Sequence, residues 1–315
     1  MIVVTGGAGF IGSNLCHRLI EDGKRVLCID NLFTGKMENL NSLLTNPKFT
    51  FINHDVNNPF EVYPVELQDN VEQIYHLACP ASPPKYQIDP IYTLKTNFLG
   101  TLNMLKLAHK KNATILFSST SEIYGEPEIS PQHEEYRGNV NTIGIRSCYD
   151  EGKRIAETLM MEFHNKHNGD IRIARIFNTF GPRMDKDDGR VVSNFINQVL
   201  RNEPITLYGD GSQTRSFCYI DDTIDGLIYL MNSEYKQPVN IGNDIEITIK
   251  ELSNIILGLI HNSNSSIIYK ELPMDDPTNR KPDISRAKNV LGWSPHCDLL
   301  TGLKKTIEYF SHTEL

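Results

Sequence analysis

The chain has 315 residues, of which 39% are hydrophobic and 22% charged, and its formal net charge is −8. The length favours one large domain with a smaller one, and the composition is typical of a globular protein. The acidic balance, without a run of Lys or Arg, argues against a nucleic-acid partner, and no apolar run is long enough to span a bilayer.

Cysteine and histidine usage gives no sign of a metal or redox motif. The six cysteines contain no C-x-x-C pair, which argues against a zinc ribbon or a thioredoxin-type site. The ten histidines are scattered, so we expect no metal site. Scattered cysteines fit a reducing compartment. Met1 leads directly into the apolar residues 2–4, so we expect no signal peptide or membrane anchor and a cytoplasmic location.

Short apolar runs alternate with helical patterns through the first half of the chain. Apolar residues at helical spacing follow the first run, at Ile11, Leu15 and Leu19. This alternation, with strands that are apolar almost throughout, predicts an α/β fold with a doubly wound parallel sheet. The six predicted strands are Ile2–Thr5, Arg25–Asp30, Phe49–Asn53, Gln73–Ala78, Thr114–Ser118 and Arg172–Ile176.

The pattern becomes less regular after Phe177. A loop rich in Gly, Pro and Arg, residues 178–189, leads to a predicted helix near 191–201, a short strand at 205–208 and a helix near 222–231. We expect a smaller second domain whose segments interleave with the first. The predicted first domain covers residues 1–177 and part of 217–243, and the second covers 178–216 and 244–315.

A glycine-rich turn follows the first predicted strand. Gly6, Gly9 and Gly12 are evenly spaced and precede a helical pattern. Glycine allows the tight turn, the approach of backbone N–H groups to a pyrophosphate and close packing of helix on strand. The start of the helix then faces the negative phosphates. This turn predicts a Rossmann-type dinucleotide site in the first domain, with Phe10 and Ile11 among its contacts.

Asp30 ends the second predicted strand and is the expected partner of the adenosine ribose. Its carboxylate can accept both ribose hydroxyls and would repel a 2′-phosphate. Asn31 and Leu32 supply no cation, so NAD is favoured over NADP, although Lys36 lies close enough to weaken the preference. Asp55, after the third strand, can reach the adenine edge in this fold. The other expected cofactor contacts are Asn31, Val56 and Leu77.

Tyr149 and Lys153 form a Tyr-x-x-x-Lys pair after the fifth predicted strand. On a helix these two positions share one face. A free tyrosine has a pKa of about 10, and an ammonium group beside it favours the phenolate. We therefore expect Tyr149 to act as a general base, with Lys153 and the positive nicotinamide ring both lowering its pKa. Both side chains are also expected to contact the cofactor.

The end of the fifth predicted strand carries a family resemblance. Residues 118–125, Ser-Ser-Thr-Ser-Glu-Ile-Tyr-Gly, resemble the extended short-chain dehydrogenase/reductases, also described as the NAD-dependent epimerase/dehydratase family. The resemblance implies that Thr120 is the third catalytic residue, which hydrogen-bonds the substrate hydroxyl that is oxidised. Ser118 and Ser119 are expected to be structural.

Longer segments narrow the resemblance to the UDP-glucuronate decarboxylases, or UDP-xylose synthases. It implies that the second domain binds a UDP-sugar and that NAD oxidises the C4 hydroxyl of glucuronate, with Tyr149 as base. The C4 ketone lies β to the C5 carboxylate, so carbon dioxide can leave, and the retained hydride then returns to C4 to give UDP-xylose. Animal and plant members often carry a membrane anchor, which is not expected here. The segments, which span essentially the whole chain, are 79–86, 120–122, 149–154, 174–183 and 279–284.

The resemblance also implies roles for residues around the sugar and the diphosphate. Glu122 and Arg280 flank the sugar carboxylate in such relatives: Arg280 would bind it in bidentate fashion, and Glu122 would act in acid–base chemistry or positioning. The local sequence alone leaves open a surface ion pair of Arg280 with an aspartate at 275, 276 or 283. Arg190 and Arg215 are expected at the UDP diphosphate. The other expected substrate contacts are Lys85, Tyr86, Lys95, Asn178 and Tyr208.

Other interpretations of the same scaffold stay open. A nucleotide-sugar 4-epimerase or 4,6-dehydratase would share the NAD site, but dehydratases of this kind place Asp-Glu after the catalytic Thr, where Ser121-Glu122 stands here. Release of the UDP-4-keto-pentose before reduction is a further alternative. A silent NAD-binding regulatory protein is disfavoured by the complete set of Thr120, Tyr149 and Lys153. The resemblance also implies a homodimer that pairs through helices beside the active site.

Overall fold

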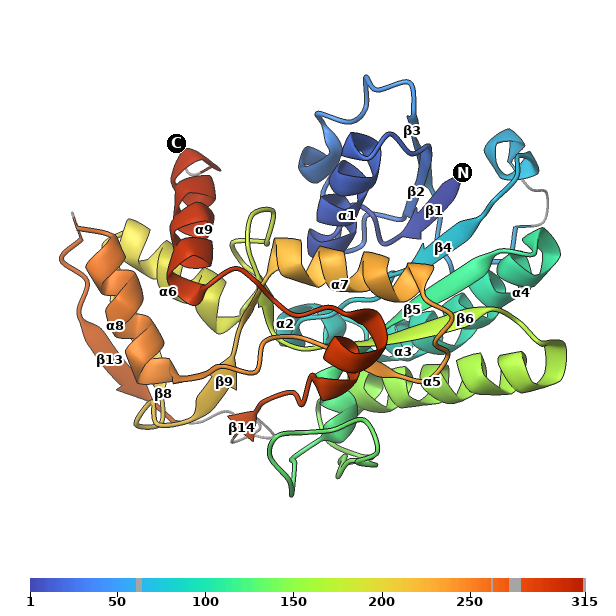
Figure 1. Cartoon of the computed structure of the whole chain (residues 1–315). Helices are drawn as coiled ribbons and strands as arrows, with labels where there is room; N and C mark the ends of the chain where they lie inside the picture. Colours follow the sequence, from blue (N-terminus) through green and yellow to red (C-terminus); the bar gives the residue numbers. More distant parts are fainter. Residues whose placement is uncertain (61–63, 262, 272–278, 314–315) are drawn as a thin grey trace.

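The computed structural model describes residues 1–60, 64–261, 263–271 and 279–313, and its centre is a seven-stranded parallel sheet (Figure 1). The strand order is β11-β6-β5-β4-β1-β2-β3. This is the order of a doubly wound sheet, so the predicted α/β, Rossmann-type fold is confirmed. The strands are β1 (Ile2–Thr5), β2 (Val26–Asp30), β3 (Phe49–Asn53), β4 (Gln73–His76), β5 (Thr114–Thr120), β6 (Ile171–Ile176) and β11 (Val239–Ile241).

The six predicted strands appear as β1 to β6, with ends that differ from the prediction by at most two residues. The seventh strand, β11, was not predicted, because it has only three residues and a polar one at its centre. That residue, Asn240, is fully buried, and its side chain donates to the carbonyls of Gln132 at 2.9 Å and Asp283 at 3.0 Å. Hydrogen bonds to loops thus satisfy a side chain that a hydrophobic pattern cannot place.

Helices cover both faces of the sheet. Ile2 and Val4 of β1 pack with α1 and α7, whereas Val3 packs on the other side with α4 and α5. This alternation is what a strand buried on both faces requires. Figure 1 shows the two helix pairs on opposite sides of the strands. The bounds are α1 (Phe10–Glu21), α4 (Thr101–Lys111), α5 (Ser147–His167) and α7 (Ile220–Asn232).

A second, smaller group of elements follows β6. The chain leaves the main sheet, returns for α7 and β11, and then leaves again. In this group β8 pairs with β13, and β9 lies between β12 and β14, with α6, α8 and α9 beside them (Figure 1). The bounds are α6 (Val191–Leu200), β8 (Ile205–Tyr208), β9 (Thr214–Ser216), β12 (Glu246–Thr248), α8 (Ile249–Leu259), β13 (Ile267–Lys270), β14 (Asn279–Arg280) and α9 (Leu299–Thr313).

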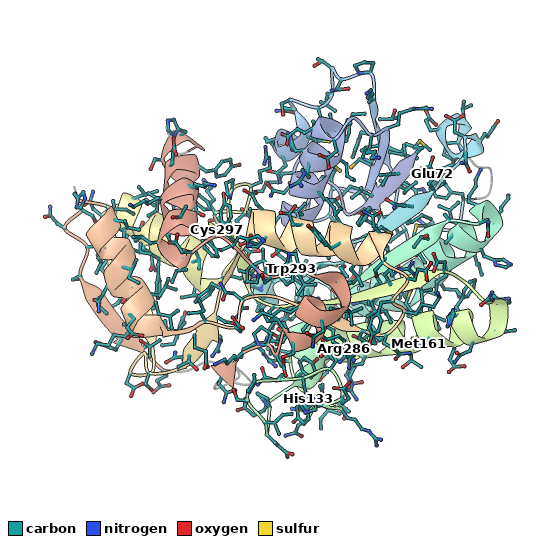
Figure 2. All side chains as sticks on the ribbon, viewed as in Figure 1. Glu72, His133, Met161, Arg286, Trp293 and Cys297 are labelled. Carbon is teal, nitrogen blue, oxygen red and sulfur yellow. The ribbon has the colours of Figure 1, made fainter. Side chains whose placement is uncertain are left out.

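The segment before α9 is joined to the main body through Asp222 at the start of α7. Trp293 Nε1 donates to the Asp222 carbonyl at 3.2 Å. The backbone N–H groups of His296 and Cys297 donate to the Asp222 carboxylate at 3.0 and 2.9 Å. Figure 2 shows Trp293 and Cys297 beside α7. One buried carboxylate thus fixes where the last segment crosses the main body.

Shorter elements connect these parts. β7 pairs in parallel with β10 next to the start of α7. None of the helices in the described ranges has the length and apolarity needed to cross a membrane. The remaining bounds are η1 (Met37–Leu40), η2 (Val65–Gln68), α2 (Pro83–Tyr86), α3 (Pro90–Lys95), η3 (Thr96–Gly100), η4 (Ser121–Tyr124), β7 (Thr179–Phe180), β10 (Cys218–Tyr219) and η5 (Ala287–Leu291).

Candidate active site

A cavity of about 1510 Å³ lies at the carboxyl ends of the main strands, and the second group of elements supplies part of its wall. Ligands in doubly wound folds bind at this edge of the sheet. Every site residue proposed from the sequence lines the cavity except Lys95. Lys95 is exposed at the end of α3, so the structure gives it no place in the site.

The glycine-rich turn forms one end of the cavity and fits a dinucleotide. Gly6 has a φ of +70°, a conformation that favours glycine. A Cβ on Gly12 would lie 2.1 Å from the Gly6 carbonyl oxygen, so only glycine lets α1 start this close to the turn. Gly9 caps the helix without a side-chain bond. Backbone N–H groups at the start of α1 are therefore accessible to an anion.

Asp30 lies beside this turn with both carboxylate oxygens held by the backbone. Oδ2 accepts the N–H of Ala8 at 3.0 Å, and Oδ1 accepts that of Leu32 at 2.8 Å. Burial raises the pKa of Asp30, and these two hydrogen bonds act in the opposite direction. The orientation of the carboxylate is thus fixed before any ribose binds.

Tyr92, which was not predicted from the sequence, links Asn31 and Asp55, two of the expected cofactor contacts. Tyr92 donates its hydroxyl proton to Asp55 at 3.0 Å and accepts a hydrogen bond from Asn31 at 2.6 Å. All three residues line the cavity. No local motif marks Tyr92, which comes from α3 and meets loops from elsewhere in the chain. Its role as a support for Asn31 and Asp55 follows only from the fold.

The proposed catalytic pair lies on the first turns of α5. Lys153 Nζ donates to the carbonyl of Ser118 at 2.7 Å and lies 5.7 Å from the ring centroid of Tyr149. The Tyr149 ring stacks on Tyr86, with centroids 5.1 Å apart and planes 8° from parallel. Thr120, at the end of β5, hydrogen-bonds the Tyr149 side chain. The strand end and the helix thus bring the three proposed catalytic residues together.

The protonation of Tyr149 differs from the expectation based on its neighbour. Burial is the largest effect and raises the pKa of Tyr149, whereas the hydrogen bond with Thr120 and the charge of Arg190 lower it. Burial also lowers the pKa of Lys153. In the protein without ligands, the phenol of Tyr149 is therefore protonated at neutral pH. The ammonium group of Lys153 does not offset the effect of burial on the pKa of Tyr149.

Glu122 is the centre of a cluster of guanidinium groups. Its Oε2 lies 2.5 Å from Arg146 Nη2 and 3.4 Å from Arg280 Nη2. Arg280 is 1% exposed and also donates to the Ser121 carbonyl at 3.0 Å. Burial excludes the alternative of a surface ion pair for Arg280. Asp275 and Asp276, two of the partners considered for that pair, lie outside the described residues.

The two carboxyl groups in this cluster have opposite pKa shifts. Burial tends to raise the pKa of Glu122, but Arg280, Arg146 and Arg215 lower it to about 2. Burial, followed by the charge of Glu122, raises the pKa of Asp150 to about 8. Sequence reasoning missed both Arg146 and Asp150. The position of Arg146 three residues before Tyr149, on the same helical face, was a signal that could have identified it.

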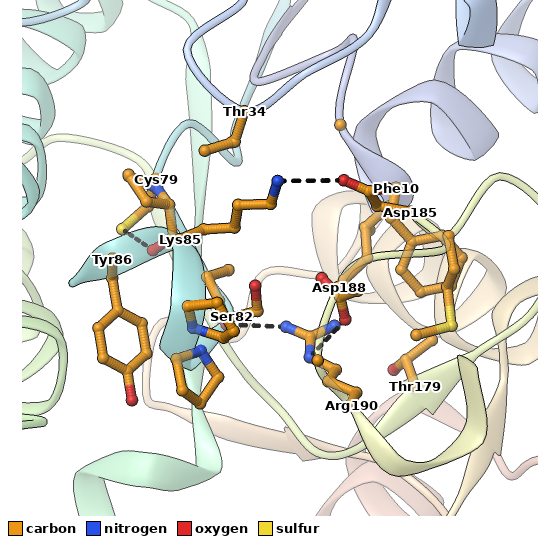
Figure 3. Close-up of a pocket in the computed structure, with 18 of the residues that line it drawn as sticks. Phe10, Thr34, Cys79, Ser82, Lys85, Tyr86, Thr179, Asp185, Asp188 and Arg190 are labelled. Carbon is orange, nitrogen blue, oxygen red and sulfur yellow. Dashed lines mark hydrogen bonds and ion pairs between the residues drawn. The ribbon is translucent and has the colours of Figure 1, made fainter. Parts of the chain in front are cut away.

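The outer part of the cavity holds the residues expected near the UDP. Arg190 Nη2 donates to the Ala81 carbonyl at 2.8 Å, and its Nε lies 3.3 Å from Asp188 (Figure 3). Arg215 is the register partner of Arg280 across β9 and β14, so the two guanidinium groups come from adjacent strand positions. Asn178 and Tyr208 complete the wall.

A model of the NAD dependent epimerase/dehydratase family matches residues 2–242. The chain belongs to this family. UDP-glucuronic acid decarboxylase 2 of Arabidopsis thaliana is 53% identical over 309 residues, which are 98% of this chain and 68% of the plant protein. UDP-glucuronic acid decarboxylase 1 of Danio rerio is 52% identical over 310 residues, 98% of this chain and 72% of the fish protein.

Solved structures of the family share the whole fold. The UDP-glucose 4-epimerase of Thermotoga maritima, in complex with UDP-glucose, has a TM-score of 0.91 and 31% identity, covering 100% of this chain and 99% of its own. The UDP-glucuronic acid 4-epimerase of Bacillus cereus, in complex with UDP-glucuronic acid and NAD, has a TM-score of 0.88 and 29% identity, covering 99% of each chain. These relatives confirm the fold and the family that the sequence predicts.

Proposed function

We propose that this chain is an NAD-dependent UDP-glucuronate decarboxylase that produces UDP-xylose and carbon dioxide. The observation that carries the proposal is the buried Arg280–Glu122 contact beside Thr120 and Tyr149, in the cavity that also contains the glycine-rich turn. Relatives more than 50% identical over almost the whole chain bear the name UDP-glucuronic acid decarboxylase, which supports the same activity.

The proposed oxidation step uses the residues at the end of β5 and the start of α5. Thr120 orients the C4 hydroxyl of the sugar, and Tyr149 accepts its proton. When bound, NAD supplies the hydride acceptor at C4 and returns the hydride after decarboxylation. Lys153, held by the Ser118 carbonyl, stabilises the phenolate that must form once the substrate and the cofactor are in place. The proton returns from Tyr149 when C4 is reduced.

The decarboxylation step uses the guanidinium cluster. Arg146 holds Glu122 through the shorter contact, so the longer contact of Arg280 with Glu122 can be exchanged for the sugar carboxylate. Loss of carbon dioxide leaves an enolate whose negative charge the nearby guanidinium groups stabilise. The enolate takes one proton at C5, so each turnover consumes one proton from solution. The ionised Glu122 would position the water that delivers it.

A second candidate, a 4-epimerase, is favoured by the Bacillus cereus structure, which holds UDP-glucuronic acid and NAD in the same fold. An epimerase would keep the carboxylate, whereas a decarboxylase would release it. The higher identity to the decarboxylases favours the first activity. A 4,6-dehydratase lacks support because Ser121 stands where that reaction needs an acid.

The test is to mix the protein with UDP-glucuronate and NAD⁺ and to identify the nucleotide-sugar product by NMR while carbon dioxide is measured. UDP-xylose with one equivalent of carbon dioxide is expected. UDP-galacturonate without carbon dioxide would establish the epimerase instead, and a UDP-4-keto-pentose would show release before reduction. In the Arg280→Ala variant the rate of carbon dioxide release should fall ~10²-fold or more, as when other groups that stabilise transition-state charge are removed.

Arg280→Ala also separates recognition of the carboxylate from a structural role. Its affinity for UDP-glucuronate should fall, whereas its affinity for UDP-glucose, which lacks the carboxylate, should be nearly unchanged. Calorimetric titration of both proteins with both ligands measures the difference. Equal weakening of the two ligands would make Arg280 a diphosphate or structural residue and would remove the main support for the decarboxylase.

We propose the remaining assignments on the same basis. Residues 1–177 and part of 217–243 would bind NAD, and residues 178–216 and 244–315 would bind the UDP-sugar, with Arg190, Arg215, Asn178 and Tyr208 near the nucleotide. A reducing compartment such as the cytoplasm fits the six free cysteines. An apolar surface on α3, the residues just before it, η3 and α5 supports a homodimer. Its exposed side chains are Ile88, Ile91, Leu94, Phe98, Leu99 and Ile155.

A further inference from the structure

Asp185 contacts two lysines that come from separate segments of the chain, and all three residues line the cavity. Its Oδ1 lies 2.7 Å from Lys36 Nζ, and its Oδ2 lies 3.3 Å from Lys85 Nζ. The Asp185 side chain is only 14% exposed. Figure 3 shows Lys85 reaching from α2 toward Asp185 on the opposite wall. One carboxylate thus pairs with the ammonium groups of two lysines, Lys36 and Lys85.

The backbone of Lys36 lies next to the proposed ribose site. Its backbone N–H donates to the Ala8 carbonyl at 3.0 Å, within the glycine-rich turn. The preceding residue, Gly35, packs so closely on Asp30 that a Cβ there would lie 2.9 Å from its Oδ2. The backbone therefore places Lys36 close to Asp30 in the chain fold, whereas its side-chain ammonium group contacts Asp185.

This arrangement bears on the choice between NAD and NADP. The two cofactors differ by one phosphate on the adenosine ribose, and proteins that bind NADP place a cation beside that phosphate. Lys36 is attached at the right place to supply such a cation. A side chain that already pairs with a carboxylate must give up that contact before it can bind a phosphate.

We propose that Asp185 is a cofactor-specificity residue, which holds Lys36 away from the position of an NADP 2′-phosphate. Asp30 disfavours that phosphate by charge, and Asp185 removes the cation that would offset the repulsion. The proposal rests on the dinucleotide end of the cavity and is independent of the sugar chemistry.

The charge state of Asp185 is consistent with this role. Burial tends to raise its pKa, but hydrogen bonds from Lys36 and from the backbone N–H of Asp187 lower it below the ordinary value. Asp185 is therefore ionised at neutral pH. The contact is partly shielded from solvent, so it is screened by salt less than an exposed pair would be.

The test compares binding of NAD⁺ and NADP⁺ to cofactor-free protein by calorimetry at fixed ionic strength. The measured quantity is the ratio of the two dissociation constants, NADP⁺ over NAD⁺. In the wild type this ratio should be at least ~10. Asp185→Asn keeps the shape of the side chain and should lower the ratio ~10-fold, mainly through tighter binding of NADP⁺.

Three further variants test whether the freed Lys36 side chain causes the change in the ratio. Adding Lys36→Met to Asp185→Asn should restore most of the wild-type ratio, because the freed cation is gone. Lys36→Met alone should leave the ratio unchanged, because Lys36 is already held by Asp185. Lys85→Met breaks the other contact of Asp185 and should also leave the ratio unchanged. Circular dichroism and thermal unfolding confirm that each variant is folded.

Two outcomes would overturn the proposal. If Asp185→Asn weakens or strengthens both cofactors equally, Asp185 merely closes the cavity. If Lys36→Met alone changes the ratio by more than ~3-fold, or fails to reverse the effect of Asp185→Asn, Lys36 is not the cation concerned. Neither outcome depends on whether the chain releases carbon dioxide from UDP-glucuronate.

Discussion

Two opposing influences act on the hydroxyl of Tyr149, namely burial, which favours the neutral phenol, and positive charge, which favours the phenolate. The Tyr149→Phe variant removes the hydroxyl and keeps the ring that stacks on Tyr86. Turnover of UDP-glucuronate should fall by ~10²-fold or more, the usual scale for a lost general base, while binding survives. Steady-state kinetics and calorimetry on the same preparations measure both quantities. Retained turnover would place the base elsewhere.

Asp150 gives a prediction about stability and pH. Burial and the charge of Glu122 raise its pKa to about 8, whereas an unfolded aspartate has a pKa of about 3.9. Between these values the folded state binds more protons than the unfolded state, so this carboxyl makes the protein less stable as pH rises. Asp150→Asn removes the titration. Its free energy of unfolding relative to wild type should increase by about 1 kcal/mol or more between pH 5 and pH 8.

Urea unfolding of both proteins at several pH values measures this difference. Asp225→Asn, on the half-exposed surface of α7, is a suitable control and should show a much smaller trend. A constant difference between Asp150→Asn and wild type across the range would mean that Asp150 is already ionised at pH 5.

At the scale of elements, α3, η3 and α5 share a surface with several exposed apolar side chains. α3 packs on α5, so the exposed side chains form one neighbouring set. Ile91 on α3 is 68% exposed and Ile155 on α5 is 44% exposed. An apolar surface shared by adjacent helices is typical of an interface rather than of a solvated face. We expect two copies to bury it.

Ile91→Glu combined with Ile155→Glu should convert the proposed dimer to a monomer, because four buried carboxylates would meet across a two-fold interface. Sedimentation velocity measures the change in mass. Ile245→Glu, at a residue that is 72% exposed next to β12, is the matched control and should leave the mass unchanged. A wild-type protein that sediments as a monomer would remove the basis for the interface.

The elements also show how far the sequence could predict the molecule. Apolar runs placed β1 to β6, since each is long enough to show a pattern. The glycine turn and the Tyr149–Lys153 pair are local motifs, and the structure places both at the cavity. β11 and Tyr92 were missed, because their positions depend on contacts between segments distant in sequence, and no local spacing reports such contacts. Arg146 was also missed, although its spacing from Tyr149 was a local signal.

Lys95 illustrates the converse limit. Lys85, ten residues earlier, lines the cavity, but Lys95 lies at the end of α3 and is exposed. The resemblance transferred both residues to the sugar site, and only the first lines the cavity. The burial of Arg280 also could not be read from the sequence, because its partners on η4 lie far away along the chain.

At the scale of the whole molecule, the cavity requires the second group of elements to keep its place against the main sheet. Asp222 is one of the contacts that hold it there: it is 5% exposed and accepts the N–H groups of His296 and Cys297. Asp222→Ala would leave two backbone donors without partners inside the protein. The free energy of unfolding should fall by about 2–3 kcal/mol, the cost of lost hydrogen bonds to a buried charge.

The same variant should affect the two ligands differently. The proposed NAD site is lined mainly by the loops that follow the first strands, whereas the proposed UDP site includes residues of β8, β9 and β14 in the second group. Asp222→Ala should therefore weaken UDP-glucuronate several-fold more than NAD⁺ when both are titrated by calorimetry. Asp225→Ala, one turn further along the exposed side of α7, breaks only a surface pair with Arg18 and should change stability by less than about 1 kcal/mol. Equal weakening of both ligands would show that the second group does not move independently, and the cavity would then respond to Asp222 as one rigid body.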